Sequence, residues 1–304
     1  MSDEDIIKLL DKDIVICGYE DSNLTDIGYN LTPTEFIFSI NKGLLLEVHN
    51  EENKKYCNVE PNDTVLIMTR EAVWVSEKIS GTFHSKVGIV SQGFGHISTT
   101  LDAHWEGPLL ISLNNPTKKR LKFVIGEDNG TGFKYKSFVT LIFYRMVTPT
   151  MTGHDNLPCR LDILRDLVSK PKYISYDNYM KLKDVIDTIR DFEDLQVNIG
   201  RAPFEQREEK IQQFKAKYQL FTKQIEFHIS QAHEINRQIL KVHIFLKILS
   251  MALLTIPLLT IFYYAYRFSV TNQQGWLTFT GILASIYGPI YVYIVFDRVF
   301  IKKG

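Results

Sequence analysis

The residues of this chain that are best suited to chemistry form one short segment. A Ser-Lys turn at Ser85 and Lys86 is followed by an aspartate, an aromatic residue and a glycine at Asp102, Trp105 and Gly107. Small residues in a tight turn present backbone amides and a hydroxyl that can hold phosphate oxygens, and a lysine adds positive charge. The order of these residues predicts a nucleotide pocket.

Each of these residues also has a purely structural interpretation. Ser85 can cap a turn, Trp105 can be an ordinary core residue, and Asp102 can accept hydrogen bonds from local amides. No single residue decides between the two interpretations. Their joint occurrence in this order favours a binding site.

The elements that must position these residues are short strands. Runs of β-branched and aromatic residues alternate with Gly, Pro, Asn and Asp, and we expect strands at 13–19, 35–40, 44–50, 63–69, 72–77, 81–90, 109–115, 121–126 and 138–147. Many short strands separated by turns predict a mainly β domain over 1–150, a barrel or jelly roll more than a βαβ sheet.

Composition restricts the possible partners and sites. The 304 residues include 35 Lys+Arg and 35 Asp+Glu, so net charge gives no argument for bulk nucleic-acid binding. Cys17, Cys57 and Cys159 lie far apart without a CxxC motif, which is typical of a reduced, cytosolic protein and argues against a disulfide framework. The histidines lack metal-ligand spacing, so we expect neither a metal nor another cofactor.

Helices are expected after residue 150. The segment 151–203 is predicted to be a connector with an amphipathic helix over 179–195, and 204–247 a coiled-coil stalk. Apolar residues recur at alternating spacings of three and four, which is typical of a coiled coil of three or four chains. The alternative is a long helix packed on its own domain. The seam residues are Ile211, Phe214, Tyr218, Phe221, Ile225, His228, Ala232, Ile235, Ile239, Val242, Leu246 and Leu249.

Two stretches without charged side chains end the chain, at 248–266 and 276–296. About 20 apolar residues are needed for a helix to cross a bilayer, so these stretches predict two transmembrane helices over 248–296 and a tail over 297–304. Lysines and arginines flank the pair on its outer sides, which places both termini and the globular domain on the cytoplasmic side of an inner membrane. A buried hydrophobic hairpin is the alternative.

Four motifs in the first 150 residues resemble those of the dCTP deaminase and dUTPase family, in the family's order. SDEDIIKLLDKDIVI at 2–16 resembles the helix and strand that begin dCTP deaminases, and IGYNLTP at 27–33 resembles their SVDLRLG-type motif. HSKVG at 84–88 resembles the family's phosphate-binding turn, and LDAHWEG at 101–107 resembles its RIDPGWxG segment. The resemblance implies a distorted β-barrel or jelly roll, usually assembled as a trimer with nucleotide pockets at subunit interfaces.

The resemblance also implies roles for individual residues. Ser85 and Lys86 would hold phosphate, and His84 stands where the family often has arginine. Asp102 would meet a deoxyribose hydroxyl, and Trp105 would pack beneath the sugar and exclude a ribose 2′-hydroxyl. All five are expected to bind ligand.

Departures from the family pattern affect catalysis. Ser112 stands where deaminases carry a proton-shuttling glutamate, and a serine has no suitable acid–base pKa. Ile89 replaces an arginine, and Asn30 replaces the aspartate of the first motif, where we count it among the ligand-binding residues. A serine at position 112 is normal in dUTPases, but their glycine-rich C-terminal arm is missing, because the chain continues into helices. We therefore expect no catalytic residues.

Three classes of function follow from these expectations. The preferred one is a homo-oligomeric, ligand-gated membrane effector that senses a nucleotide or short DNA oligomer and controls a pore or membrane disruption. Its layout is similar to bacterial nucleotide-signalling antiphage effectors such as the Hailong type, in which a nucleotidyltransferase encoded alongside supplies the ligand. The second class is a membrane-anchored dUTPase or dCTP deaminase-type hydrolase. The third is a scaffold without a ligand.

Overall fold

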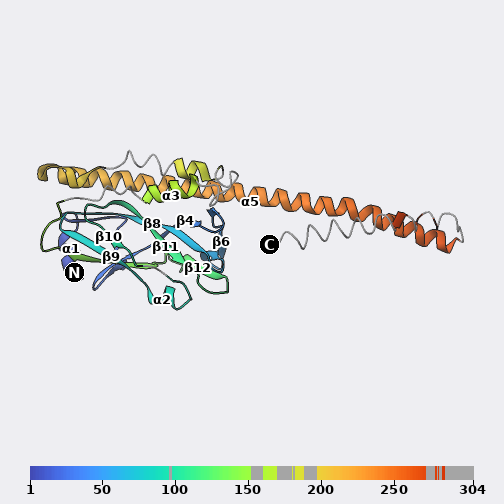
Figure 1. The fold of residues 1–304 in the computed structure, drawn as a ribbon, viewed down its shortest axis with the longest axis horizontal. Coiled ribbons are helices and arrows are strands. Elements are labelled where there is room, and N and C mark those ends of the chain that lie inside the picture. Colours follow the sequence, from blue (N-terminus) through green and yellow to red (C-terminus); the bar gives the residue numbers. More distant parts are fainter. Residues whose placement is uncertain are drawn as a thin grey trace. The chain divides into compact units, whose positions relative to one another are not determined.

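The structure is a computed structural model and describes residues 1–95, 98–151, 160–169, 180, 182–187, 197–271, 278, 280 and 283–284. These residues fall into two compact units, Met1–Glu234 and Ile235–Gly304. The first unit contains a β domain together with the helices that cover it (Figure 1).

The β domain begins with helix α1 (Asp3–Leu9), which Ser2 and Asp5 cap reciprocally. Its strands are β1 (Ile14–Cys17), β2 (Leu24–Thr25), β3 (Gly28–Leu31), β4 (Pro33–Ser39), β5 (Leu44–Leu45), β6 (Val48–Glu51), β7 (Lys54–Val59), β8 (Thr64–Val75), β9 (Ile79–Ser85), β10 (Thr100–Leu101), β11 (Glu106–Asn114), β12 (Leu121–Asp128), β13 (Phe133–Tyr135) and β14 (Val139–Arg145). The mainly β character expected for the N-terminal region is confirmed.

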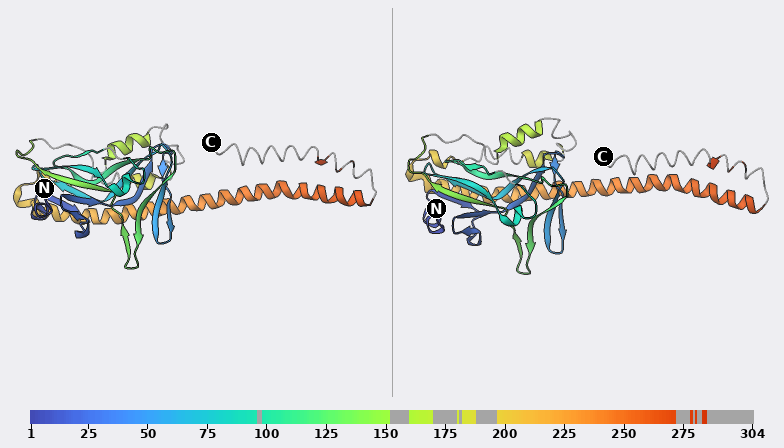
Figure 2. Two further views of the ribbon diagram at one scale, coloured as in Figure 1. Left: turned by 90° about the horizontal axis from the view of Figure 1, so that it is seen from below. Right: turned by 60° about the horizontal axis from the view of Figure 1, so that its bottom comes forward.

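The strands form three antiparallel sheets. Sheet A has the order β1-β8-β4-β5, with β11 also paired to β8; sheet B has the order β10-β9-β14-β3-β2; sheet C has the order β13-β12-β7-β6. In sheet C the hairpins β6–β7 and β12–β13 project from one side of the domain (Figure 2). Glu52 and Asn53 both have left-handed backbone at the β6–β7 turn, as a tight hairpin requires.

Three expected strands have different bounds in the structure. The runs 63–69 and 72–77 are parts of one long strand, β8, because neighbouring strands pair with both of its halves. The run 81–90 stops at Ser85, and helix α2 (Val87–Val90) follows. The amides of Ile89 and Val90 bond to the Lys86 carbonyl, so a local turn overrides the β-branched composition.

The strands of sheet A are apolar on both faces. In β8 the side chains of Val65, Ile67 and Val73 enter an inner core between the sheets. The alternate residues Leu66 and Trp74 enter a second, outer core. A strand that is buried on both sides must be covered by another layer.

Helices α3 (Leu161–Ser169) and α5 (Phe204–Val270) are the elements that cover this face (Figure 1). The outer core combines sheet A with Leu164 of α3 and with the first seam residues of α5. Those α5 residues are Ile211, Phe214, Tyr218, Phe221 and Ile225, each at most 3 % exposed. The predicted coiled coil is therefore not confirmed: up to Ile225 the helix packs on its own domain, because sheet A offers a matching apolar face.

Most later seam residues have side chains outside the described set. Leu246 and Leu249 are described and are exposed. The helix predicted over 179–195 is described only in part, where 182–187 are helical and Leu182 and Val185 join the outer core. Cys159 and the second apolar stretch, apart from four of its residues, also lie outside the described residues.

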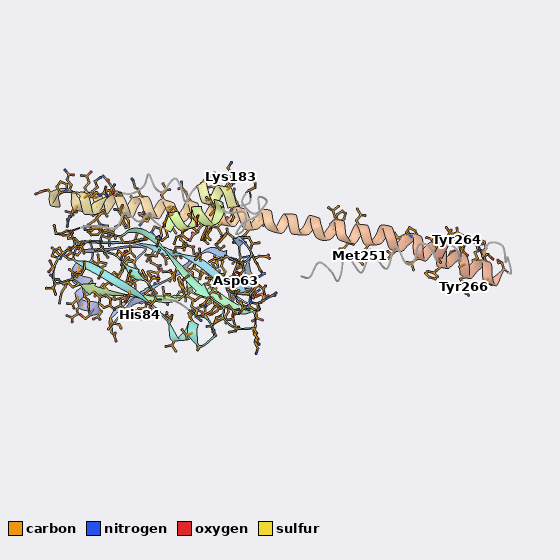
Figure 3. The ribbon with its side chains drawn as sticks, in the orientation of Figure 1. Asp63, His84, Lys183, Met251, Tyr264 and Tyr266 are labelled. Atoms are coloured by element: carbon orange, nitrogen blue, oxygen red, sulfur yellow. The ribbon has the colours of Figure 1, made fainter. Side chains whose placement is uncertain are left out.

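The second unit contains the remainder of α5, on which Figure 3 labels Met251, Tyr264 and Tyr266. Among the residues that the structure describes, no helix is both long enough and apolar enough to cross a bilayer. This finding contradicts the predicted inner-membrane location. The prediction rested on two charge-free stretches, and most of the second stretch lies outside the described residues.

Candidate functional site

The predicted binding residues Asn30 and His84 lie on one face of sheet B. Thr140 of β14 pairs with Asn30 on one side and with His84 on the other. Paired residues of an antiparallel sheet point to the same face, so the three side chains form a row across β3, β14 and β9. The Thr140 hydroxyl donates to Asn30 Oδ1 at 2.8 Å, which fixes one end of the row.

A small polar network continues this face from His84. Thr82 Oγ1 lies 2.9 Å from His84 Nε2 and 3.0 Å from the Tyr144 hydroxyl. His84 is exposed on the side of the β domain away from α5 (Figure 3). Thr82 and Tyr144 were not predicted from the sequence. The available signal was Thr82, a polar residue two positions before His84, because such residues of a strand lie on the same face.

The turn after β9 carries the predicted phosphate-binding residues. Ser85 is the last residue of β9, pairs with Val139 and is partly exposed. Lys86 is the N-cap residue of α2, and its ammonium donates to the Ser137 hydroxyl at 2.8 Å. Burial lowers the pKa of Lys86. The two residues together offer a hydroxyl and a half-buried cation.

The second predicted half of the site is the segment from Asp102 to Trp105. Trp105 is 8 % exposed and belongs to the inner core, where its indole N–H donates to the Gly107 carbonyl at 2.9 Å. Trp105 therefore has a packing role in this chain. The Asp102 side chain is partly exposed and accepts from Thr100 Oγ1 at 3.3 Å.

A cation from beyond the β domain lies near this half. Arg160 forms two hydrogen bonds to the Asp162 carboxylate, at 3.1 and 2.8 Å. These bonds raise the pKa of Arg160, burial opposes them, and the charge of Asp102 adds a smaller upward effect. Arg160 was not among the predicted site residues, and no sequence pattern placed it near Asp102.

The two halves lie toward opposite ends of β9. In the antiparallel pair β10–β9, Leu101 lies opposite Gly81, and the chain runs away from Ser85 as it approaches Asp102. Ser85 lies four positions after Gly81, which at about 3.3 Å per residue amounts to roughly 13 Å. Within one copy of the chain, Ser85 and Asp102 are therefore not adjacent.

The residues that replace the family's catalytic groups have structural surroundings. Ile89 is 5 % exposed and packs in the inner core. Ser112 lies on β11 opposite Leu66, on the sheet A face where Leu110 packs against the outer core. The neighbours of Ser112 along the strand, Ile111 and Leu113, enter the inner core instead.

Two buried carboxyl groups, Glu71 and Glu106 of the LDAHWEG motif, were not predicted as site residues. Glu71 is 2 % exposed and accepts from the backbone N–H and the hydroxyl of Thr32, at 2.9 and 2.6 Å. Burial raises the pKa of Glu71 to about 7, although these hydrogen bonds oppose the shift. Glu106 accepts from the backbone amides of Val197 and Ile199, and burial raises its pKa as well. A carboxyl inside an apolar strand was the signal for both.

Comparisons with known proteins agree with the motif resemblance. No family model matches the chain. A deoxyuridine 5′-triphosphate nucleotidohydrolase of Wigglesworthia glossinidia brevipalpis is 35% identical over 78 residues, which are 24% of this chain and 50% of that protein. The chain thus spans half the length of this relative. A dCTP deaminase of Pyrococcus horikoshii is 24% identical over 138 residues, 45% of this chain and 80% of that protein.

Solved structures of dUTPases also resemble the chain. The native EIAV dUTPase is 16% identical, with 39% of this chain and 96% of that chain covered and a TM-score of 0.26. The dUTPase of Staphylococcus bacteriophage 80alpha is 17% identical, with 40% and 89% covered and a TM-score of 0.24. The sequence similarity to these two relatives and the β architecture described above agree: the N-terminal region of this chain has a dUTPase/dCTP deaminase-like fold.

Proposed function

We propose that the chain binds a pyrimidine deoxynucleoside triphosphate between two copies of itself. Ser85 and Lys86 of one copy would hold the phosphates, and Asp102 of the second copy would accept a hydrogen bond from the sugar. The observation that carries this proposal is the separation of the two half-motifs along β9, because one copy alone cannot bring both to one small ligand. In a closed head-to-tail ring of identical subunits, each interface joins two different surfaces of the same subunit.

The nucleotide class rests on the relatives. Their names give deoxyuridine triphosphate and dCTP as the molecules on which they act, and both are pyrimidine deoxynucleotides. The chemistry of the first half-motif suits a triphosphate, since Lys86 is a partly desolvated cation whose attraction for an anion is stronger than that of a fully solvated lysine. The polar row of Asn30, Thr140 and His84 extends this surface with further hydrogen-bonding groups.

Deamination is not part of the proposal. A hydroxyl at Ser112 cannot shuttle a proton to a nucleotide ring near neutral pH. Ser112 also lies on the face of sheet A that the outer core covers, away from the polar face of sheet B. Binding of the nucleotide without change to its base is therefore the function that we propose.

Hydrolysis of the triphosphate is the second candidate function. It is favoured by the similarity to a deoxyuridine 5′-triphosphate nucleotidohydrolase over 78 residues. The membrane effector is not retained. Nucleotide sensing without turnover is compatible with the proposed binding, and the same assay separates it from hydrolysis.

The test uses the full chain with dUTP, dCTP, dTTP, the corresponding ribonucleotide UTP and a short DNA oligomer. We expect saturable binding of a pyrimidine deoxynucleotide by calorimetry, without ammonia release. Lys86→Met is expected to weaken binding at least about tenfold, because it removes a charge-assisted contact worth more than about 1.4 kcal/mol. Lys118→Met, at an exposed lysine outside the half-motifs, is the matched control. Pyrophosphate release at a steady rate would favour the hydrolase.

Complementation tests the position of the site between copies. Lys86→Met and Asp102→Asn each remove one half-motif, and neither variant is expected to bind nucleotide well alone. Mixed oligomers obtained by coexpression would pair an intact Ser85–Lys86 half with an intact Asp102 half at about a quarter of their interfaces. Recovery of that share of binding supports a site between copies, and no recovery in a verified mixed oligomer contradicts it.

A further inference from the structure

The predicted sugar-binding segment has two faces with different neighbours. From Leu101 to Trp105, alternate residues enter the β domain, where Leu101 and Trp105 are part of the inner core. The residues between them and just after them, Asp102, His104 and Glu106, face the segments that follow the β domain. Each of the three lies near a residue from beyond position 150.

Glu106 makes the most extensive of these contacts. Its carboxylate is 8 % exposed and accepts hydrogen bonds from the backbone amides of Val197 and Ile199, the latter at 3.1 Å. Asn198 between them has left-handed backbone, and its amide also helps to stabilise the carboxylate. Successive amides that converge in this way form a nest for an anion. Here the anion is a side chain of the LDAHWEG motif.

His104 is held at the same place. It has a left-handed backbone, with φ of 62°, which a residue other than glycine adopts only when its surroundings compensate for the strain. Its ring packs against Gly200, since a Cβ added at Gly200 would lie 2.6 Å from His104 Nδ1. Asp102 in turn lies close enough to Arg160 to raise its pKa.

The partners of the motif belong to the helical cover of sheet A. Val197 and Ile199 are 4 % and 0 % exposed and are part of the outer core, together with Trp74 and the first seam residues of α5. Trp74 also lies directly opposite Glu106 in the β8–β11 pair. The helical 3₁₀ turn η4 (Ile199–Arg201) precedes α5 by only a few residues.

We propose that Glu106 is a positioning residue that couples the ligand-binding segment at Asp102 to the docking of residues 197–229 on sheet A. The inference rests on the proposed function. A ligand that requires the strained turn at His104 stabilises the docked helices. Undocking of the helices lowers the affinity for the ligand by the same factor, because coupling between two sites is reciprocal. The helical cover thereby regulates the nucleotide site.

The test compares Glu106→Gln with Glu77→Gln in the full chain. Glu77, which lies outside the motif in sequence, also joins the β domain to α5, through an ion pair with Arg207 at 3.5 Å. With dUTP and dCTP as probes, Glu106→Gln is expected to weaken binding about tenfold and Glu77→Gln less than about twofold. In the wild type, saturating probe is expected to slow hydrogen exchange at the Val197 and Ile199 amides about tenfold, a response that a purely structural role would not produce.

A second variant keeps the test decisive when Glu106→Gln fails to fold. Gly200→Ala places a methyl group against His104 and leaves Glu106 intact. It is expected to weaken binding and to reduce the exchange response together. Wild-type protein that binds neither probe would overturn the proposed function and the coupling with it. Probe binding that leaves exchange at 197–199 unchanged would overturn the coupling alone, and so would probe binding that Glu106→Gln and Gly200→Ala both retain fully.

Discussion

Sheets A and B have the same antiparallel pairing but opposite surface chemistry. In sheet A the strand β8 is buried at nearly every position, and its two faces enter the inner and the outer core. In sheet B the strand β9 alternates, with Ile79 and Phe83 buried and Thr82 and His84 on the other side. The sheet with two apolar faces needs a helical cover, whereas the sheet with one polar face leaves that face available for a ligand.

This difference explains why one sheet of the first unit is covered by a helix and the other keeps an accessible polar face. Helix α5 covers sheet A, so its apolar seam residues stabilise the domain instead of a coiled coil. The polar row of sheet B and the turn at Ser85 and Lys86 remain accessible on another side of the domain. The segment from Asp102 to Glu106 is the place where the two surfaces are connected.

The largest expected effect comes from weakening the cover of sheet A. Phe214 is completely buried in the outer core and its ring centroid lies 4.5 Å from that of Tyr218. Phe214→Ala is expected to lower the free energy of unfolding by about 3–5 kcal/mol, measured by urea denaturation. Leu220→Ala, on the same helix but 59 % exposed, is the control and should change it by less than about 1 kcal/mol.

Hydrogen exchange shows whether the cover is separable from the β domain. In Phe214→Ala, amides of 211–229 are expected to lose protection while those of β9 and β14 keep it. Equal loss in both regions would mean that the β domain does not stay folded without its cover.

The next effect concerns the buried carboxyl between the two sheets. Glu71 holds Thr32 where the chain passes from β3 of sheet B to β4 of sheet A, and its pKa is raised by burial from 4.5 to about 7. Between these values the folded state keeps a proton that the unfolded state has lost, so stability falls as pH rises through this window. The expected loss is roughly 3 kcal/mol.

Glu71→Gln tests this assignment. The amide oxygen can accept from the Thr32 N–H, and the amide N–H can donate to the Thr32 hydroxyl, so the shape of the contact is retained. Denaturation at pH 5 and pH 8 should show a much smaller difference in the variant than in the wild type. An unchanged pH dependence in Glu71→Gln would assign the titration to another group.

A smaller effect is expected on the polar face of sheet B. Thr82→Val removes the hydroxyl that lies 2.9 Å from His84 Nε2 and 3.0 Å from the Tyr144 hydroxyl. Because this face is open to water, the free energy of unfolding should change by less than about 1 kcal/mol. Thermal denaturation measures it, and a loss as large as that of Phe214→Ala would show that sheet B is covered in solution.

The smallest effect concerns an ion pair at the edge of the cover. Lys215 of α5 lies 2.7 Å from Asp11, which is 54 % exposed. Lys215→Met should lower the free energy of unfolding by about 0.5 kcal/mol, and the difference should shrink in 0.5–1 M salt because exposed charges are screened. A difference that persists at high salt would indicate lost packing of the lysine stem instead.

The sequence by itself determined the local features. Alternating and continuous apolar runs predicted the strands, since side-chain direction in a strand repeats every two residues. The motif order predicted a dUTPase/dCTP deaminase-like domain, because each motif, such as 84–88 or 101–107, is an unbroken segment of the sequence. The apolar seam of α5 was also visible, but its spacing is the same for a coiled coil and for a helix packed on a sheet.

Only the tertiary structure decided which surfaces meet. The pairing of α5 with sheet A, the distance between Ser85 and Asp102 along β9, and the contact of Glu106 with Val197 and Ile199 all join residues far apart in the sequence. A periodic pattern states that a face must be buried, but not against what. That choice depends on the shape and position of the opposing face, which exist only after the chain has folded.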